Sequence, residues 1–426
     1  MKDPRRCSDV VNQNLTLIGI MKAEKQSRKG IYIHIPFCVR KCEYCDFLSF
    51  PAAVQLRENY VQALVREIRE WNVRGRQWLR NIKSDADEPE DEEVCSIFIG
   101  GGTPSILETE QIAWILKTVS EAFNVIDDSE ITVECNPGTL TEEKLKELRS
   151  AGVNRLSIGL QSADEKELRL LGRIHDRKMF EEHYLDARKA GFSNINVDLM
   201  SALPGQSLAD WERTLTYVLS LTPPPEHISA YSLIIEEGTP FFSKYSGKGA
   251  SLLPDEDTER AMYHATRKLL RAHGYDRYEI SNYARRGFEC RHNTGYWERR
   301  PYLGFGLGAA SCAKEIRWRN TEKLPLYLQA YAGETRDSEG KFCKEDVTVL
   351  TRRDRIEETV FLGLRMTTGI DMREFERNFD ESILDIYGSA IDELLQDGLV
   401  YIADGRFALT EKGMDLEGYV EGKLLC

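Results

Sequence analysis

The spacing of three cysteines is the clearest chemical signal in the chain. Cys38, Cys42 and Cys45 lie within eight residues, and their thiolates suit either zinc or an iron–sulfur cluster. A structural zinc site needs four protein ligands in a closed tetrahedron, but Phe47 stands where a nearby fourth cysteine could have followed. Three thiolates can instead hold three corners of a [4Fe–4S] cubane and leave its fourth iron open to an external ligand. The spacing therefore favours such a cluster.

Glycine and polar residues follow other β-rich runs at corresponding positions. Residues 100–104, Gly-Gly-Gly-Thr-Pro, close the second predicted strand, and glycine lets backbone amides approach a ligand without interference from a Cβ atom. Glu134 ends the third strand, Gln161 follows the fourth, and Asp198 lies near the end of the fifth. Each could be an ordinary turn or capping residue. Because the strand ends of a βα barrel meet at one rim, together they predict a polar site there.

The elements that position these residues alternate regularly between short β-rich runs and longer amphipathic segments. We predict strands at residues 31–35, 96–100, 130–134, 155–160, 195–200 and 227–235, and helices at 56–71, 110–123, 142–151, 178–190, 209–221 and 257–273, before a short run at 278–281. Repeated βα units imply a parallel sheet, and right-handed crossovers curl it toward a barrel. The fold class is therefore α/β, with a partial (β/α)6 barrel.

The last 80 residues have a different pattern. Residues 355–365, 370–378 and 383–396 are predicted helices, and two strands, 399–402 and 406–409, flank the turn Ala403-Asp404-Gly405. Helices followed by a small hairpin suggest a winged-helix-like α+β domain. We divide the chain into an N-terminal extension, expected to be poorly ordered, the barrel, a connecting region and this domain, at residues 1–30, 31–285, 286–344 and 345–426. Residues 83–93 form an acidic loop, and either Met1 or Met21 could be the true start.

Charge and cysteine usage limit the function classes. The net charge is −13, and residues 345–426 carry 19 acidic and 9 basic side chains, so binding to nucleic acid through phosphates is disfavoured. A structural or partner-binding role suits the C-terminal domain better than DNA binding. Seven of the ten cysteines are scattered, which indicates a reducing, cytoplasmic compartment rather than a disulfide framework. No apolar run is long enough for a transmembrane segment, and no secretory signal is recognisable.

The CxxxCxxC spacing after a first strand resembles the signature of the radical S-adenosylmethionine (SAM) superfamily. The resemblance narrows further, because a series of segments follows the order of the oxygen-independent coproporphyrinogen III oxidase family: IYIHIPFC, IFIGGGTPS, VECNPGT, GVNRLSIGLQS, VDLMSALPGQ and GYDRYEISNYA. It covers nearly the whole chain from about residue 31. One departure is Ser201-Ala202, where Tyr-Gly is usual, and we expect it to alter only loop packing.

The resemblance implies roles for individual residues. The open iron of the cluster would bind SAM, whose reductive cleavage yields a 5′-deoxyadenosyl radical. Tyr44 matches an aromatic residue near the SAM adenine. Tyr32 and Glu134 would contact the cluster-bound SAM. The residues that correspond to those around a second SAM in the oxidase are Gly101, Gly102, Thr103, Gln161, Arg173 and Asp198.

Three features separate the chain from the oxidase of that family. The oxidase pattern is CxxxCxxCxC, whereas this chain has Phe47 at the last position, and only 37 residues precede Cys38 where the oxidase has a longer segment that closes its active site. The segment 292–297, His-Asn-Thr-Gly-Tyr-Trp, resembles the HNxxYW hallmark of the haem chaperones of the HemW type. Histidine is a common axial haem ligand, and Tyr296 and Trp297 could line an apolar pocket. His292 could equally be a hydrogen-bonded structural residue.

Two hypotheses follow. The first is a haem chaperone that carries a [4Fe–4S] cluster with exchangeable SAM, binds haem as cargo and passes it to haem-acceptor proteins. The second is an oxygen-independent coproporphyrinogen III oxidase, although we do not expect oxidase activity. A DNA-binding regulator is a distant third. The sequence leaves open the identity of the acceptor, the haem ligand, whether SAM is cleaved, and whether the chain forms a homodimer.

Overall fold

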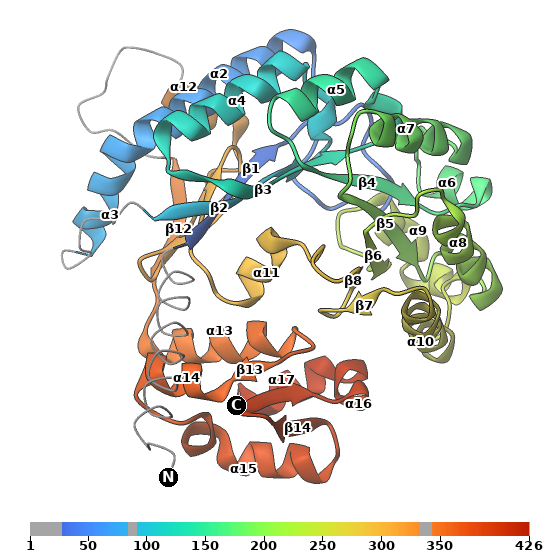
Figure 1. Ribbon diagram of the computed structural model, residues 1–426, viewed down its shortest axis with the longest axis vertical. Helices are drawn as coiled ribbons and strands as arrows, with labels where there is room; N and C mark the ends of the chain where they lie inside the picture. Colours follow the sequence, from blue (N-terminus) through green and yellow to red (C-terminus); the bar gives the residue numbers. More distant parts are fainter. Residues whose placement is uncertain (1–27, 84–91, 332–342, 426) are drawn as a thin grey trace, which may run out of the picture.

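The computed structural model describes residues 28–83, 92–331 and 343–425, and a curved twelve-stranded sheet dominates it (Figure 1). The strand order is β12-β11-β10-β9-β1-β2-β3-β4-β5-β6-β8-β7, and the strands β1 to β6 pair in parallel with one another. This confirms the predicted α/β class and the six parallel barrel strands. Their bounds are β1 Arg28–Ile35, β2 Glu93–Gly101, β3 Val125–Cys135, β4 Arg155–Gln161, β5 Ile195–Ser201 and β6 His227–Ser232.

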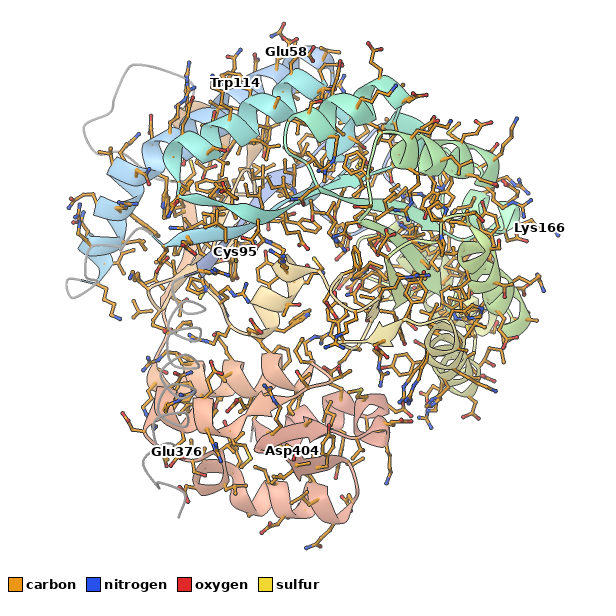
Figure 2. All side chains as sticks on the ribbon, viewed as in Figure 1. Glu58, Cys95, Trp114, Lys166, Glu376 and Asp404 are labelled. Carbon is orange, nitrogen blue, oxygen red and sulfur yellow. The ribbon has the colours of Figure 1, made fainter. Side chains whose placement is uncertain are left out.

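The crossover helices cover the convex face of the sheet (Figure 1), and Figure 2 shows Glu58, Trp114 and Lys166 on this outer layer. The longer helices are amphipathic and bury an apolar face against the strands, whereas α9 packs in a smaller cluster with Leu171 and Leu203. Several begin at a side-chain cap, as α8 does at Ser207. Their bounds are α2 Val54–Glu70, α3 Arg76–Ile82, α4 Thr109–Ala122, α5 Glu142–Ser150, α6 Glu165–Leu170, α7 Arg177–Lys189, α8 Leu208–Ser220, α9 Pro240–Tyr245 and α10 Glu256–Ala272.

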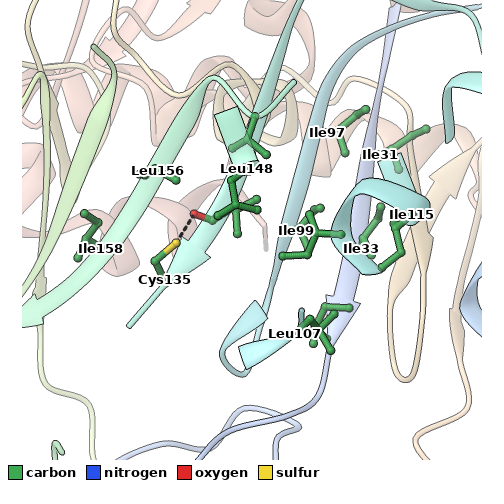
Figure 3. Packing of buried hydrophobic residues seen from close by; sticks show 14 of the residues in the cluster. Ile31, Ile33, Ile97, Ile99, Leu107, Ile115, Cys135, Leu148, Leu156 and Ile158 are labelled. Carbon is green, nitrogen blue, oxygen red and sulfur yellow. Dashed lines mark hydrogen bonds between the residues drawn. The ribbon is translucent and has the colours of Figure 1, made fainter. Parts of the chain in front are cut away.

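Branched aliphatic residues fill the space between the sheet and these helices. Ile31, Ile33, Ile97 and Ile99 alternate along β1 and β2 and meet Ile115 of α4, all without solvent exposure (Figure 3). Side chains at alternate positions of a strand share one face, so the residues between them point to the concave side. The packing of the convex face thus fixes which side chains enter the barrel lumen.

The region from 286 to 349 contains elements that the sequence patterns did not predict. β9 pairs in parallel with β1, from Gly30 opposite Tyr302 to Ile33 opposite Phe305, and β10 to β12 extend the sheet with antiparallel pairing. Apart from β12, these strands have only four or five residues, too few for a clear periodicity. The bounds are α11 Arg291–Trp297, β9 Tyr302–Phe305, β10 Ala310–Ala313, β11 Ile316–Asn320, α12 Leu324–Tyr331 and β12 Lys344–Val349.

At the other edge of the sheet, the predicted run 278–281 is not a strand. Two short strands flank it instead, β7 at Asp276–Arg277 and β8 at Asn282–Ala284, and β8 pairs antiparallel with β6. The backbone of Tyr278 is engaged elsewhere, because its carbonyl oxygen accepts the N–H of Thr367 from the C-terminal domain. Pairing across domains therefore replaces the expected strand.

The C-terminal domain has a core of its own, in which Phe375, Ile391 and Phe407 are buried. It combines the predicted helices and hairpin with an additional strand, β13, which gives the small sheet the order β13-β15-β14, and with two further helices. The bounds are α13 Arg352–Leu364, β13 Ile370–Asp371, α14 Met372–Phe379, α15 Ile383–Gln396, β14 Val400–Ala403, β15 Arg406–Leu409, α16 Glu411–Asp415 and α17 Glu417–Leu424.

α11 lies on the concave side of the barrel sheet, between β1 and β2 on one side and α13 on the other (Figure 1). The HNxxYW segment therefore sits where the barrel meets the C-terminal domain. In the part of the chain that the structure describes, no helix is long and apolar enough to cross a membrane. The predicted acidic loop and N-terminal extension lie almost wholly outside the described residues.

Candidate cluster and SAM site with an adjoining HNxxYW helix

The three cysteines lie in the loop that follows β1, at the carboxyl end of the parallel strands. The backbone N–H of Cys38 donates to Phe50 O at 3.1 Å, which closes the loop, and the N–H of Cys45 donates to Cys42 O at 3.4 Å. All three cysteines are free thiols; Cys38 is buried, and Cys42 and Cys45 are partly exposed. Phe47 is 62% exposed, so its side chain does not fill the place of a fourth ligand inside the loop.

The glycine turn after β2 packs directly against this loop. The N–H groups of Gly102 and Thr103 donate to Ile35 O and Phe37 O at 2.9 and 2.7 Å. A Cβ atom on Gly102 would lie 2.6 Å from the carbonyl oxygen of Phe37, a distance that real side chains do not show. The turn therefore needs glycine for the close approach of two backbones, independently of any ligand.

A polar network connects two of the cysteines. Thr103 Oγ1 donates to Cys38 Sγ at 3.5 Å and accepts from Asn136 Nδ2 at 2.8 Å. Asn136 Oδ1 in turn accepts from Arg173 Nη2 at 2.6 Å, and Arg173 Nη1 donates to Cys42 Sγ at 3.6 Å. Asn136 is the central member of this network. It lies in the quoted VECNPGT segment, but its role was not predicted, because an asparagine before proline also reads as a turn residue.

These contacts fit a thiolate-bound cluster. Cys38 and Cys42 each receive a side-chain hydrogen bond, one of them from a guanidinium. Burial raises the pKa of the Cys45 thiol, while hydrogen bonds from the Phe47 backbone and the Ser49 hydroxyl oppose that rise. Hydrogen bonds to sulfur tune such clusters and stabilise negative charge on the ligands. In the described residues, no three histidine, cysteine or acidic side chains converge on a single metal ion, but in a cubane each cysteine binds a different iron.

The remaining predicted SAM residues surround the loop and the lumen beneath it. Tyr44 packs against Phe241 with the ring centroids 6.3 Å apart, and burial raises its pKa. Gln161 ends β4 with a positive φ of 70°, a conformation that non-glycine residues adopt rarely. Tyr32 OH lies 2.9 Å from His34 Nδ1, and burial raises the pKa of Tyr32 as well. Bound at the cluster, SAM would supply adenosyl radical chemistry.

Two partly buried carboxyl groups line the same lumen. Glu134 Oε2 accepts the N–H of Gly101 at 2.9 Å, and burial, followed by repulsion from Asp198, raises the pKa of Glu134 to about 8. Asp198 accepts hydrogen bonds from Ser157 and Asn196, and burial raises its pKa too. Arg155 lies on the intervening strand β4 and is almost fully buried. A lumen that holds carboxyl groups at this depth is suited to a cationic ligand such as the SAM ammonium or sulfonium.

The HNxxYW helix, α11, packs against β1 and β2 on the concave side of the sheet. Both ring nitrogens of His292 have partners, since Nδ1 lies 3.0 Å from Ser96 Oγ and Nε2 lies 2.9 Å from Tyr296 OH. Burial lowers the His292 pKa to about 3, so the ring is neutral at physiological pH. Trp297 faces the other way and stacks under Arg365 of the C-terminal domain at 4.7 Å. The three residues of the motif therefore do not line one common pocket.

A cavity of about 190 Å³ brings the two groups of predicted residues together. It is bounded by Tyr32, Glu134 and Asp198 on the SAM side and by His292 and Tyr296 on the α11 side. Arg155 also lines it, with an Nε atom that has no hydrogen-bond partner. Arg155 was not among the predicted site residues, although a charged residue at the start of a buried strand was the available signal.

The comparisons with known proteins agree with this arrangement. Residues 32–218 match the model of the radical SAM superfamily, and residues 350–416 match the HemN C-terminal domain. A protein of Lactococcus lactis named heme chaperone HemW is 35% identical over 400 residues, which cover 94% of this chain and 98% of that protein. Its Bacillus subtilis namesake is 36% identical over 93% and 99% of the two chains. This chain belongs to the HemW family of radical SAM proteins.

Membership of the HemW family confirms the resemblance inferred from the motifs. Another relative, the mitochondrial radical S-adenosyl methionine domain-containing protein 1 of Danio rerio, is 32% identical over 88% of this chain and 82% of its own. A solved structure of coproporphyrinogen III oxidase HemN from Escherichia coli superimposes with a TM-score of 0.76 at 25% identity, covering 94% of this chain and 90% of that one. The barrel and the C-terminal domain thus follow one shared architecture.

Proposed function

We propose that this protein is a haem chaperone, which binds haem and transfers it to haem-acceptor proteins. Its [4Fe–4S] cluster is held by Cys38, Cys42 and Cys45, and SAM binds as an exchangeable ligand of the open iron. The observation that carries the proposal is the position of α11. The helix with the HNxxYW segment contributes His292 and Tyr296 to the cavity that Glu134 and Asp198 also line.

The names of the relatives support haem as the cargo. Two curated proteins that this chain covers over 98% and 99% of their length bear the name heme chaperone HemW, and the match extends over both the barrel and the C-terminal domain. Phe47 at the position of the oxidase's last cysteine points the same way, and its exposed ring leaves the loop with three thiols.

The second candidate is an oxygen-independent coproporphyrinogen III oxidase. The likeness to HemN, a radical SAM enzyme with that activity, favours it, and the acidic and basic groups of the lumen are those a radical enzyme could use. The oxidase would turn over coproporphyrinogen III and the chaperone would not, so assays on one preparation can decide between the two functions.

The test is to reconstitute the cluster anaerobically and to assay haem binding and porphyrinogen decarboxylation on the same sample. We expect binding of about one haem per chain and no formation of protoporphyrinogen IX in the presence of SAM and reductant. Transfer is then followed by mixing the haem-loaded protein with a haem-free cytochrome and recording the cytochrome spectrum. Multiple turnovers of coproporphyrinogen III would replace the chaperone by the oxidase, and a preparation that binds no haem would overturn the chaperone.

We also propose that the protein works in a reducing compartment, the cytoplasm being the one expected from its sequence. Its eight described cysteines are all free, and five of them, including Cys312, lie far along the chain from the cysteine loop. A [4Fe–4S] cluster with an open iron needs the same protection from oxidation. Fractionation of the native cells with an antibody against this chain tests the location, and recovery in an oxidising compartment would contradict it.

A further inference from the structure

A second and larger cavity lies between the barrel and the C-terminal domain. Its volume is about 480 Å³, within the range of roughly 300–1,000 Å³ that small-molecule sites have. Tyr32 and Tyr296 line both this interdomain cavity and the lumen cavity, so their rings form a common wall. Of the predicted site residues, Tyr32 and Tyr296 line the interdomain cavity, and the rest of its walls come from β1, α11, β9 to β11 and α13.

The wall formed by β9 and α11 is aromatic. The rings of Tyr296 and Tyr302 meet edge to face with their centroids 4.7 Å apart, and Leu362 of α13 lies on the side of the C-terminal domain. Gly308, Ala309 and Ala310 also line the cavity and carry almost no side chain. A cavity lined by aromatic rings and by a stretch of backbone with small side chains accommodates a flat apolar ring better than a bulky one.

Guanidinium groups form the polar edge of the interdomain cavity. Arg299 Nε and Arg317 Nη1 both pair with the carboxylate of Glu358 from α13, at 3.0 and 2.8 Å. Arg299 also pairs with Glu315, and Arg300 with Glu298. Glu358 thus lies between the guanidinium groups of Arg299 and Arg317. A carboxylate of a ligand could displace Glu358 from this position, since paired arginines suit carboxylate recognition.

A thiol completes the site. Cys312 on β10 stands opposite Tyr302 of β9 and Arg317 of β11 in the sheet register, and it is a free cysteine that lines the cavity. Burial raises the pKa of the Cys312 thiol and outweighs the charges of Arg317 and Arg299, which lower it. The free thiol is therefore protonated, and it would bind a metal ion by giving up its proton beside these cations.

We propose that the interdomain cavity binds an iron porphyrin, with Cys312 Sγ as an axial ligand of the iron and with Arg299 and Arg317 holding propionates in place of Glu358. Tyr296 and Tyr302 pack against the macrocycle. On binding ferric haem, the thiol releases its proton to solvent, its sulfur electron pair forms the iron–sulfur bond, and a water or hydroxide ligand leaves that axial position, without any change in oxidation state. The proposal rests on the proposed haem-chaperone function and assigns its cargo site.

The proposal predicts opposite effects for two substitutions. Cys312→Ser removes the sulfur ligand, so haem should bind about tenfold more weakly and with a changed Soret band, while iron-free protoporphyrin IX should bind as it does to the unmodified chain. Glu358→Gln removes the internal competitor for the guanidiniums, so haem should bind several-fold more tightly. The dimethyl ester of haem, which has no free propionates, should show no such gain.

Titrations of the full-length protein with haem, its dimethyl ester and protoporphyrin IX, followed by absorption and fluorescence quenching, measure these effects. Cys343→Ser is the matched control, because Cys343 is also a partly exposed free cysteine but does not line the cavity. A misfolded Cys312 variant would lose protoporphyrin IX as well as haem, and misfolding cannot produce the gain expected of Glu358→Gln.

Failures of the two proposals are distinguishable. If the unmodified chain binds no haem, the chaperone function falls. If it binds haem but the Soret band and affinity are unchanged in Cys312→Ser, and the affinity is unchanged in Glu358→Gln, the interdomain cavity is not the cargo site. A changed band without the gain in Glu358→Gln would overturn the assignment of the propionates.

Discussion

Glu130 Oε1 accepts the backbone N–H of His292 at 3.2 Å, so a side chain of strand β3 caps the first turn of the HNxxYW helix. Its second oxygen accepts the N–H of Arg291 at 3.1 Å and lies 4.0 Å from Arg155 Nε. Neither Glu130 nor Arg155 is more than slightly exposed. A buried ion pair inside the barrel therefore fixes the place of a helix that begins 161 residues later in the chain.

Replacing Glu130 by alanine should destabilise the protein by about 3–5 kcal/mol, because it leaves the buried charge of Arg155 unpaired and the helix uncapped. Urea unfolding followed by circular dichroism measures the change. Asp128→Ala is the control, since Asp128 forms an exposed ion pair with the same Arg291 and should cost at most about 1 kcal/mol. Equal losses of unfolding free energy in the two variants would show that Glu130 contributes no more to stability than the exposed ion pair of Asp128.

Alanine at any one of Cys38, Cys42 or Cys45 should abolish a stable [4Fe–4S] cluster, because each thiolate would be the only protein ligand of its iron. Iron and sulfide analysis of anaerobically purified variants provides the readout. Alanine at Cys312 or Cys343 should leave four irons per chain, since both lie outside the loop. A variant without all three loop cysteines that retained four irons would rule out the ligand assignment.

Gly102→Ala should reduce both iron content and SAM binding, because the added Cβ would displace the Phe37 backbone next to Cys38. A substitution at Gly102 therefore cannot separate cluster assembly from SAM binding. This differs from the simple expectation that a change in a SAM-binding turn leaves the iron content unchanged. Gly138→Ala serves as the control, since its Cβ would meet nothing closer than 3.5 Å. Full iron occupancy in Gly102→Ala would contradict the backbone contact.

Glu134 should make the stability of the SAM-free protein depend on pH. Its pKa is about 8 in the folded chain, raised mainly by burial, against an ordinary value of 4.5. Between these values the folded state retains a proton that the unfolded state loses, so the contribution of Glu134 to stability falls as the pH rises. The advantage of Glu134→Gln over the unmodified chain should therefore grow from about pH 5 to pH 8 in urea unfolding experiments. A constant difference would refute the raised pKa.

His292→Ala distinguishes an iron ligand from a positioning residue. Because both ring nitrogens already bond to Ser96 and Tyr296, we expect His292 to hold the Tyr296 ring in place. The variant should then bind haem and iron-free protoporphyrin IX more weakly by similar factors. A loss confined to haem, with a changed Soret band, would instead identify His292 as the ligand, as its residue type alone suggests.

Local patterns were sufficient for the parallel strands, because alternation and helical periodicity extend over five or more residues in each βα unit. Local patterns did not predict β9, because its four residues take their conformation from pairing with β1, which is distant from them in the sequence. They failed likewise at residues 278–281, where the backbone of Tyr278 bonds to Thr367 of another domain. In both places long-range pairing overrides a weak local preference.

The sequence alone predicted the cysteine ligand set, and it determined the α/β class and the rim on which the polar residues gather, since these depend on patterns along the chain. Tertiary structure decided what surrounds them. It placed Arg173 on Cys42 across 131 residues, gave His292 two hydrogen-bond partners, and formed a cavity from Cys312, Arg317 and a helix of another domain. Such contacts arise only when separate elements pack together, so no local spacing encodes them.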